Sequence, residues 1–282
     1  MVENDRWGTL LAHLILILGV AVVVFPVYVA IIASTHAPGT FLQGVMPLLP
    51  GAHGWENYRT VIFEGRSNAG APPIGIMLWN SFVMAMMIAV GKIAISLLSA
   101  FAIVYFRFPG RIFFFWIIFV TLMLPIEVRI VPTYQVVANL HLLNTYAGLS
   151  IPLIASATAT FLFRQFFMTV PEEMLEAARV DGAGPWKFFK DILVPLSVTN
   201  IAAMFVIMFI YGWNQYLWPL LITTDDSYYT IVMGIQRMVT GADSEPLWHL
   251  VMATVVLAAL PPILVILFMQ RLFVKGLTET EK

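Results

Sequence analysis

Long stretches without a single charged side chain constrain the fold of this chain more than any other feature. Residues 14–33 form an uncharged apolar run of 20 residues, and no Asp, Glu, Lys, Arg or His occurs from Ile192 to Thr224. An α-helix of about 20 apolar residues crosses the hydrocarbon core of a bilayer. Because backbone polar groups in lipid must be satisfied within the protein, we expect such runs to form membrane-spanning helices.

The composition indicates the same class for the whole chain. Hydrophobic residues make up 60% of its 282 residues and charged residues 11%, whereas soluble domains have about 45–50% and about 25%. We therefore predict an all-α polytopic membrane protein. The formal net charge of −1 gives no basis for a nucleic-acid partner. Since the chain has no cysteine, it has no disulfide and no thiolate metal site.

Six apolar segments are expected to be transmembrane helices. The first fits an uncleaved anchor better than a signal peptide, because it is long and no clear small-x-small cleavage site accompanies it. After it, the polar residues 34–76 are expected to form a solvated loop with a short helix at 55–63, since irregular backbone is unstable in lipid. The six predicted spans are 14–33, 78–106, 112–126, 146–163, a helix within 192–224, and 250–270.

The distribution of basic residues predicts the orientation of these spans. Six spans place both termini on one side of the membrane, and loops rich in Lys and Arg stay in the cytoplasm. With a cytoplasmic N-terminus, ten of the fifteen basic residues are cytoplasmic: Arg6, Arg107, Arg111, Arg164, Arg179, Lys187, Lys190, Arg271, Lys275 and Lys282. This orientation makes the polar segment between the fourth and fifth spans cytoplasmic.

That polar segment, residues 169–196, is predicted to form two short helices around a sharp turn. Thr169 and Glu172 have the spacing of a capping box, and Pro171 suits a first helical turn. One face of the first helix is expected to carry residues at i, i+3 and i+4 spacing. These residues are Leu175, Ala178 and Arg179.

Glycine and proline define the second half of the segment. Gly182 is expected to end the first helix in the left-handed conformation. Pro185 is expected to begin the second helix, and Pro195 to mark the entry to the fifth span. The apolar contacts of the second helix are expected from Trp186, Phe188, Phe189 and Ile192. By themselves these features also fit an amphipathic connector lying on lipid headgroups.

The letters EAARVDGAGPWKFFKDILVP, residues 176–195, carry a longer pattern. They follow E-A-A-x-x-x-G, nine residues, then I-x-L-P, with Val194 where leucine is usual. This pattern resembles the EAA loop of ABC importer permeases. The resemblance implies that the loop docks on an ATP-hydrolysing subunit through Glu176, Ala177, Ala178, Asp181, Gly182 and Ala183.

The resemblance extends over essentially the whole chain. LPIEVRIVPTYQVVANLHLLNTYAGLSIPL, YGWNQYLWPLLIT and the ending MQRLFVKGL resemble carbohydrate-type ABC importer permeases, near the maltose-type second permease and nearest the branch for sn-glycerol-3-phosphate. It implies the type I importer fold with six transmembrane helices in a bacterial inner membrane. It also implies a second, A-type permease, two ATPase copies that bind ATP and Mg²⁺, a periplasmic binding protein, and no cofactor on this chain.

Three parts are expected along the chain. Residues 1–76 form an anchor helix and a periplasmic loop, 77–275 the importer transmembrane domain with its cytoplasmic coupling loop 169–196, and 276–282 a cytoplasmic tail. The sequence has no G-x-x-x-x-G-K-[ST] phosphate loop, and its five histidines are scattered. A non-catalytic subunit without a metal site is therefore expected.

Polar residues inside the spans are candidates for the translocation path. Lys92 lies near the middle of the second span, where a cation is costly and usually faces the bundle interior. We hypothesise that it neutralises a passing phosphate; the alternative is an interior pair or hydrogen bond. Glu127 and Arg129 at the outer mouth could touch cargo or binding protein, or pair locally. Further path candidates, equally explained by interhelical hydrogen bonds, are Asn80, Asn214, Gln215 and Tyr216.

Two other functions are compatible with the sequence. Within the importer class, the cargo could be an uncharged sugar or maltodextrin, whereas glycerophosphodiesters are a further candidate beside sn-glycerol-3-phosphate. Outside the class, a secondary carrier or channel would work without an ATPase.

Overall fold

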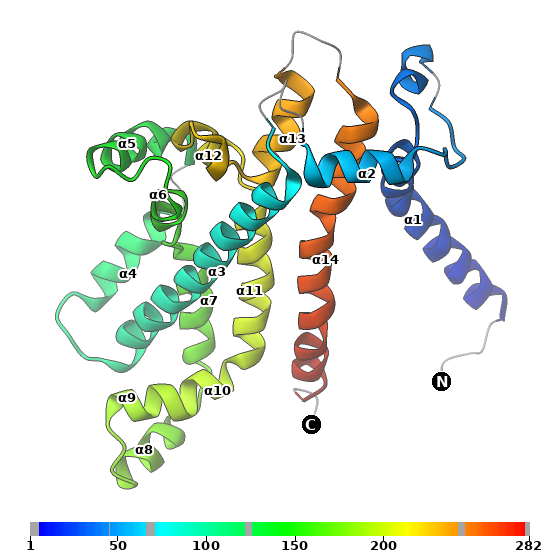
Figure 1. Ribbon diagram of the computed structural model, residues 1–282. Helices are drawn as coiled ribbons and strands as arrows, with labels where there is room; N and C mark the ends of the chain where they lie inside the picture. The colour runs from blue at the N-terminus through cyan, green and yellow to red at the C-terminus, as the bar shows by residue number, and fades with distance from the viewer. Residues whose placement is uncertain (1–5, 45, 66–70, 122–125, 242–245, 280–282) are drawn as a thin grey trace. The chain divides into compact units, whose positions relative to one another are not determined.

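The computed structural model describes residues 6–44, 46–65, 71–121, 126–241 and 246–279. Within these ranges the chain is built from helices and connecting loops, which confirms the predicted all-α class (Figure 1). The chain divides into two compact units. One comprises Met1–Gly75 and Gly234–Leu260, and the other comprises Ile76–Met233 and Pro261–Lys282.

The first unit begins with α1, Arg6–Ala33, which is followed by the 3-10 helix η1, Pro38–Gln43, and by α2, Gly54–Phe63. The short helix expected at 55–63 is thus confirmed. Asn57 of α2 is buried, and its side-chain amide donates to the carbonyls of Ser34 at 2.9 Å and His36 at 2.8 Å. These bonds fix α2 to the chain that leaves α1.

The second unit contains most of the remaining helices. In chain order they are α3, Ile74–Tyr105; α4, Arg111–Val120; α5, Ile126–Asn139; α6, Tyr146–Ser150; the 3-10 helix η4, Ile151–Leu153; α7, Ala157–Phe167; α8, Glu172–Val180; α9, Pro185–Phe188; the π-helix η5, Phe189–Leu193; α10, Val194–Leu196; α11, Val198–Trp213; α12, Leu217–Ile222; and the 3-10 helix η6, Asp226–Tyr228. The first two residues of α3 belong to the first unit, and the residues of two further helices are also divided between the units: α13, Ile231–Thr240, and α14, Trp248–Glu279.

Several of these helices are apolar enough to cross a membrane. In the described parts of the chain, length and composition qualify three of them, over Trp7–Ala33, Ile74–Tyr105 and Trp248–Gln270. Two bent pairs also qualify, so that up to five spans result if each pair counts as one. The pairs are Tyr146–Leu153 with Ala157–Phe167, bent by 51°, and Pro185–Leu196 with Val198–Trp213, bent by 73°.

The third predicted span, 112–126, differs most from expectation. Its described helix, α4, has 10 residues and ends at Val120, well short of the about 20 that cross a bilayer when straight. Arg129 and Pro132, which were expected to follow the span, lie inside the separate helix α5. Residues 122–125 lie outside the described ranges.

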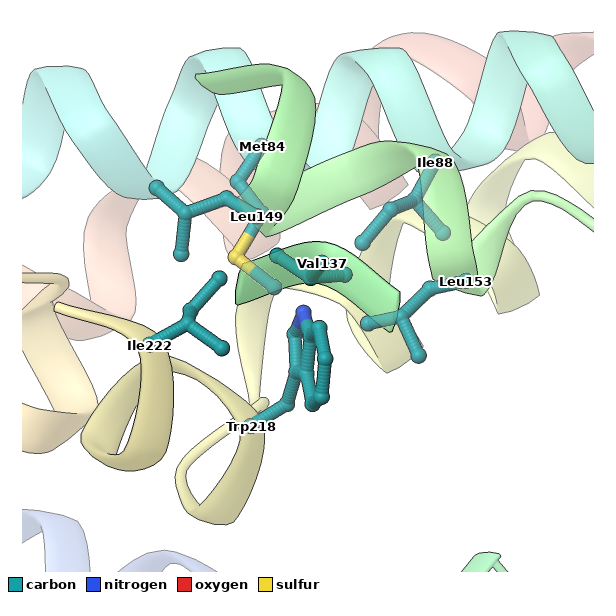
Figure 2. Packing of buried hydrophobic residues seen from close by; sticks show 7 residues of the cluster. All are labelled: Met84, Ile88, Val137, Leu149, Leu153, Trp218 and Ile222. Carbon is teal, nitrogen blue, oxygen red and sulfur yellow. The ribbon is translucent and has the colours of Figure 1, made fainter. Parts of the chain in front are cut away.

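A hydrophobic cluster in the second unit explains why the uncharged run 192–224 is not one helix. Figure 2 shows seven buried side chains from α3, α5, α6, η4 and α12, namely Met84, Ile88, Val137, Leu149, Leu153, Trp218 and Ile222. The indole N–H of Trp218 donates to the carbonyl of Gly148 at 3.1 Å. Within this run, α11 therefore ends at Trp213, and the separate helix α12 packs into the cluster through Trp218 and Ile222.

Candidate coupling loop and translocation path

The first helix of the coupling loop, α8, begins without the predicted capping box. The N-cap residue is Pro171 and makes no side-chain cap bond. The hydroxyl of Thr169 instead donates to the carbonyl of Phe166 at 2.7 Å, because Thr169 still belongs to the turn that closes α7. The capping-box prediction was wrong for this reason. Glu172 and Glu173 occupy the first turn, where the helix dipole favours negative charge.

The turn after α8 has the predicted geometry. Gly182 adopts φ +72°, in the left-handed region, and the N–H of Ala183 donates to the carbonyl of Ala178 at 2.8 Å. Such bonds satisfy the free carbonyls at the end of a helix. The second helix, α9, then begins at Pro185 as predicted.

One face of the loop is packed against the rest of its unit. Leu175, Ala178 and Arg179 line one cavity of about 790 Å³, so the prediction that they share a face is confirmed. The same cavity is lined by the end of α3, by Arg107 of the following loop and by Arg111 at the start of α4. On this side Ala178 is buried, Leu175 is half-buried and Arg179 is exposed.

Aromatic side chains anchor the second helix to α3. Phe188 and Phe189 are buried. The ring of Phe188 lies 5.2 Å from that of Tyr105, and the ring of Phe189 lies 4.9 Å from that of Phe101. These contacts confirm two of the predicted apolar contacts. Because Tyr105 and Phe101 belong to α3, a displacement of α9 is mechanically linked to that long helix.

The other face of the loop is open. Of the six residues assigned to ATPase coupling, Glu176, Ala177, Asp181 and Gly182 are exposed, whereas Ala178 and Ala183 face the cavity.

Two exposed apolar side chains accompany these four residues. Val180 is 87% exposed, and Trp186 is 63% exposed although its ring stacks on Phe189 at 5.3 Å. Trp186 was expected to be an apolar contact, and it is only partly covered. Val180 was not among the residues predicted from the sequence, although an apolar residue at the end of a charged helix is an available signal.

The second helix joins the following span through an irregular segment. After α9 the helix widens into the π-turn Phe189–Leu193, and it breaks at Ser197, whose hydroxyl donates to the carbonyl of Leu193 at 2.6 Å. Pro195 has no N–H to donate and cannot continue the regular ladder. This interruption accompanies the 73° bend before α11, and π-turns of this kind are frequent at functional sites.

Lys92 lies in the interior of the second unit. Its side chain is 6% exposed, and its ammonium lies 3.7 Å from the centroid of the Tyr211 ring on α11. Among the described side chains it makes no ion pair or hydrogen bond. A cation–π contact is worth about 0.5–2 kcal/mol, less than the about 2.5–3.5 kcal/mol that insertion scales assign to a charge at a helix centre. Tyr211 was not predicted from the sequence as this partner.

Asn80 is held in a hydrogen-bond network. Its amide donates to the carbonyls of Ser227 at 2.7 Å and Tyr229 at 3.0 Å, and its carbonyl accepts from the hydroxyl of Tyr146 at 2.7 Å. Ser227 also donates twice to Asp225, which holds the pKa of that carboxyl below its usual value. The interhelical hydrogen bonding proposed as the alternative role of Asn80 is therefore present.

The remaining path candidates do not converge on one site. Asn80 and Lys92 are 12 positions apart on α3, about 18 Å along the helix axis. Asn214 is exposed at the end of α11, and Tyr216 precedes α12. Gln215 donates to the carbonyl of Tyr211 at 3.1 Å, which places it next to the partner of Lys92.

Of the two residues predicted at the outer mouth, the structure describes the side chain of Arg129 only. Arg129 is exposed on α5 and lies within electrostatic range of both Lys92 and Tyr211. The side chain of Glu127 lies outside the described side chains, so its pairing with Arg129 stays a prediction.

Three comparisons with known proteins place this geometry in context. Residues 92–279 match the model of the family described as "Binding-protein-dependent transport system inner membrane component". A solved structure of a bacterial ABC transporter that imports the acidic polysaccharide alginate has the same fold. Its TM-score is 0.77 at 20% identity, over 96% of this chain and 98% of that chain.

Curated relatives match the chain from end to end. Proteins named "sn-glycerol-3-phosphate transport system permease protein UgpE" are 59% identical in Brucella melitensis, 57% in Yersinia enterocolitica and 56% in Agrobacterium fabrum, with 100% of both chains covered in each case. The chain therefore belongs to the family of binding-protein-dependent transport system inner membrane components, as a multi-pass, non-catalytic permease subunit.

Proposed function

We propose that this chain is a permease subunit of an ATP-driven importer that carries sn-glycerol-3-phosphate across the inner membrane. The observation that supports this cargo is the full-length identity of 56–59% to relatives that bear its name. Glycerophosphodiesters, which share the glycerophosphoryl group, are a second cargo of the same system.

The importer contains further subunits. A second, A-type permease completes the membrane pathway, a periplasmic binding protein delivers the cargo, and two copies of an ATPase subunit bind ATP and Mg²⁺. Both termini and the coupling loop lie in the cytoplasm, in agreement with the excess of Lys and Arg in the corresponding segments.

The open face of the coupling loop binds a groove on one ATPase subunit. Glu176, Ala177, Asp181 and Gly182 are exposed on this face together with Val180. An exposed apolar side chain gains free energy when a partner covers it. Ala178 and Ala183 support the loop from the cavity side, where they line the same cavity as Tyr105 at the end of α3.

Phe188 and Phe189, which pack against α3, transmit movement of the bound loop to the membrane-spanning helices. When ATP draws the two ATPase subunits together, the loops move with them, and Phe188 and Phe189 pass the displacement to α3. The bend before α11 passes it to the fifth span. The permease pair then opens outward to take the cargo from the binding protein, and ATP hydrolysis returns it to the inward-open state.

Reconstitution tests this function. The complete complex in proteoliposomes, supplied with its binding protein, is expected to hydrolyse ATP faster when sn-glycerol-3-phosphate is added than when a maltodextrin is added. Faster hydrolysis with the maltodextrin would make the complex an uncharged-sugar importer. Uptake by the permeases without the ATPase would instead indicate a secondary carrier or channel.

A further inference from the structure

Lys92 is a buried cation for which the described side chains supply no negative charge. Its side chain is 6% exposed and extends from the middle of α3. The described carboxylates of the second unit lie in the coupling loop and its continuation, residues 172–191, and at Asp225 and Asp226, beyond the ends of α3 and α11. A buried ammonium whose described surroundings contain no carboxylate is a site that an anion can complete.

Tyr211 supplies a replaceable partner for this ammonium. The ring holds the ammonium at 3.7 Å through its face, without a hydrogen bond. The ring itself packs against the hydrophobic cluster around Met84 and Trp218, so its position is defined by the core. A cation–π contact is weaker than a charge-assisted hydrogen bond to phosphate, which can therefore displace it.

Arg129 adds a second positive charge near Lys92. It lies within electrostatic range of both Lys92 and Tyr211, and it is exposed. Its neighbour Ile130 packs against the same hydrophobic cluster, which contains Val137 of α5. Among the described side chains, two like charges thus lie within electrostatic range of each other, and an anion bound near them would be stabilised by both.

We propose that Lys92 and Arg129 form a binding site for the phosphate group of the cargo on the translocation path, with Tyr211 as the positioning residue that holds Lys92 when the site is empty. This inference rests on the proposed function. A phosphate monoester carries a charge of about −1.5 to −2 at pH 7, which matches two cations. A site on a transport path must also release its cargo, and a replaceable aromatic partner favours release.

Uptake by the reconstituted complex tests the site through the charge of the cargo. The two cargoes are sn-glycerol-3-phosphate, a monoester that is largely a dianion, and glycerophosphocholine, whose diester phosphate is a monoanion. K92M is expected to lower monoester uptake about tenfold, the effect of one charge-assisted hydrogen bond. It is expected to lower diester uptake less, whereas K92R should keep uptake of both within about threefold of the wild type.

Variants of Tyr211 and Ser96 complete the experiment. Y211F keeps the ring face and should behave as wild type, whereas Y211L should lower monoester uptake about threefold. S96A, one helical turn from Lys92 on α3 and outside the proposed site, is the matched control and should leave the ratio of the two uptakes unchanged. Co-purification of the ATPase checks that each variant assembles.

The outcomes separate this site from the proposed function. If the wild-type complex takes up neither cargo, the proposed function fails. If the wild type is active and K92M transports the monoester normally, or loses both cargoes equally while K92R is also inactive, the phosphate site is refuted. Should K92M not assemble, Y211L decides, because an unchanged ratio of the two uptakes in Y211L refutes the site.

Discussion

The coupling loop and the surroundings of Lys92 place their functional groups in opposite environments. The loop exposes Val180 and Trp186 on a scaffold that Phe188 and Phe189 tie to α3. Lys92 instead lies inside the unit, against a ring that the hydrophobic cluster holds in place. A surface that binds a protein partner can thus be separated from its anchors by mutation. A buried site depends on the core that surrounds it.

The largest expected effect is a loss of uptake when Gly182 is replaced, and it tests whether the backbone conformation of the turn, and not the space for a side chain, is needed for coupling. Gly182→Val should abolish uptake, because φ +72° costs an L-residue about 1–2 kcal/mol and a β-branched side chain more. A Cβ added at Gly182 or at Gly184 would meet no other atom within 4 Å, but Gly184 has φ −70°. Gly184→Ala is therefore the matched control and should retain uptake. Normal uptake by Gly182→Val would remove the turn from the coupling mechanism.

The next comparison separates anchoring from partner binding. Phe188→Ala should lower the stability of the permease by about 3–5 kcal/mol, since Phe188 is buried. Trp186→Ala should leave the thermal unfolding midpoint nearly unchanged and weaken ATPase association by about thirtyfold, the smaller end of an interface hot spot. Thermal unfolding in detergent and ATPase pull-down measure the two effects. Equal unfolding midpoints for the two variants would contradict the division into anchor and docking face.

The smallest expected effect concerns Asn80. Asn80→Ala removes the partner of three hydrogen bonds and should destabilise the permease by about 1–3 kcal/mol. It should leave the preference between monoester and diester cargo unchanged, because the network lies about 18 Å along α3 from Lys92. A changed cargo preference would extend the phosphate site to this network.

Local backbone chemistry accounts for most of what the sequence could predict in the loop. The left-handed turn at Gly182 and the helix start at Pro185 follow from the limits that these two residues place on φ. The capping box failed because the hydroxyl of Thr169 had a nearer acceptor in the preceding turn. Spacing alone does not report such a competing bond.

Tertiary contacts account for what the sequence could not predict. The uncharged run up to Thr224 contains α12, and only the cluster around Trp218 explains why it leaves the span. Lys92 was recognisable as a buried cation, but its partner Tyr211 comes from a distant helix. Apolar runs indicate membrane-spanning helices, but they do not say which face of one helix contacts another.

The bare surface of α1 has a consequence for how the protein is made. Only 6% of an 18-residue apolar stretch of α1 is buried inside the chain. The hydrogen bonds of Asn57 are made to Ser34 and His36, which follow α1, and not to residues of the helix. A segment with so little of its surface packed on later helices can leave the insertion machinery and enter lipid while the rest of the chain is still being synthesised. Biogenesis of the subunit can therefore start at its first helix, well before the coupling loop has been translated.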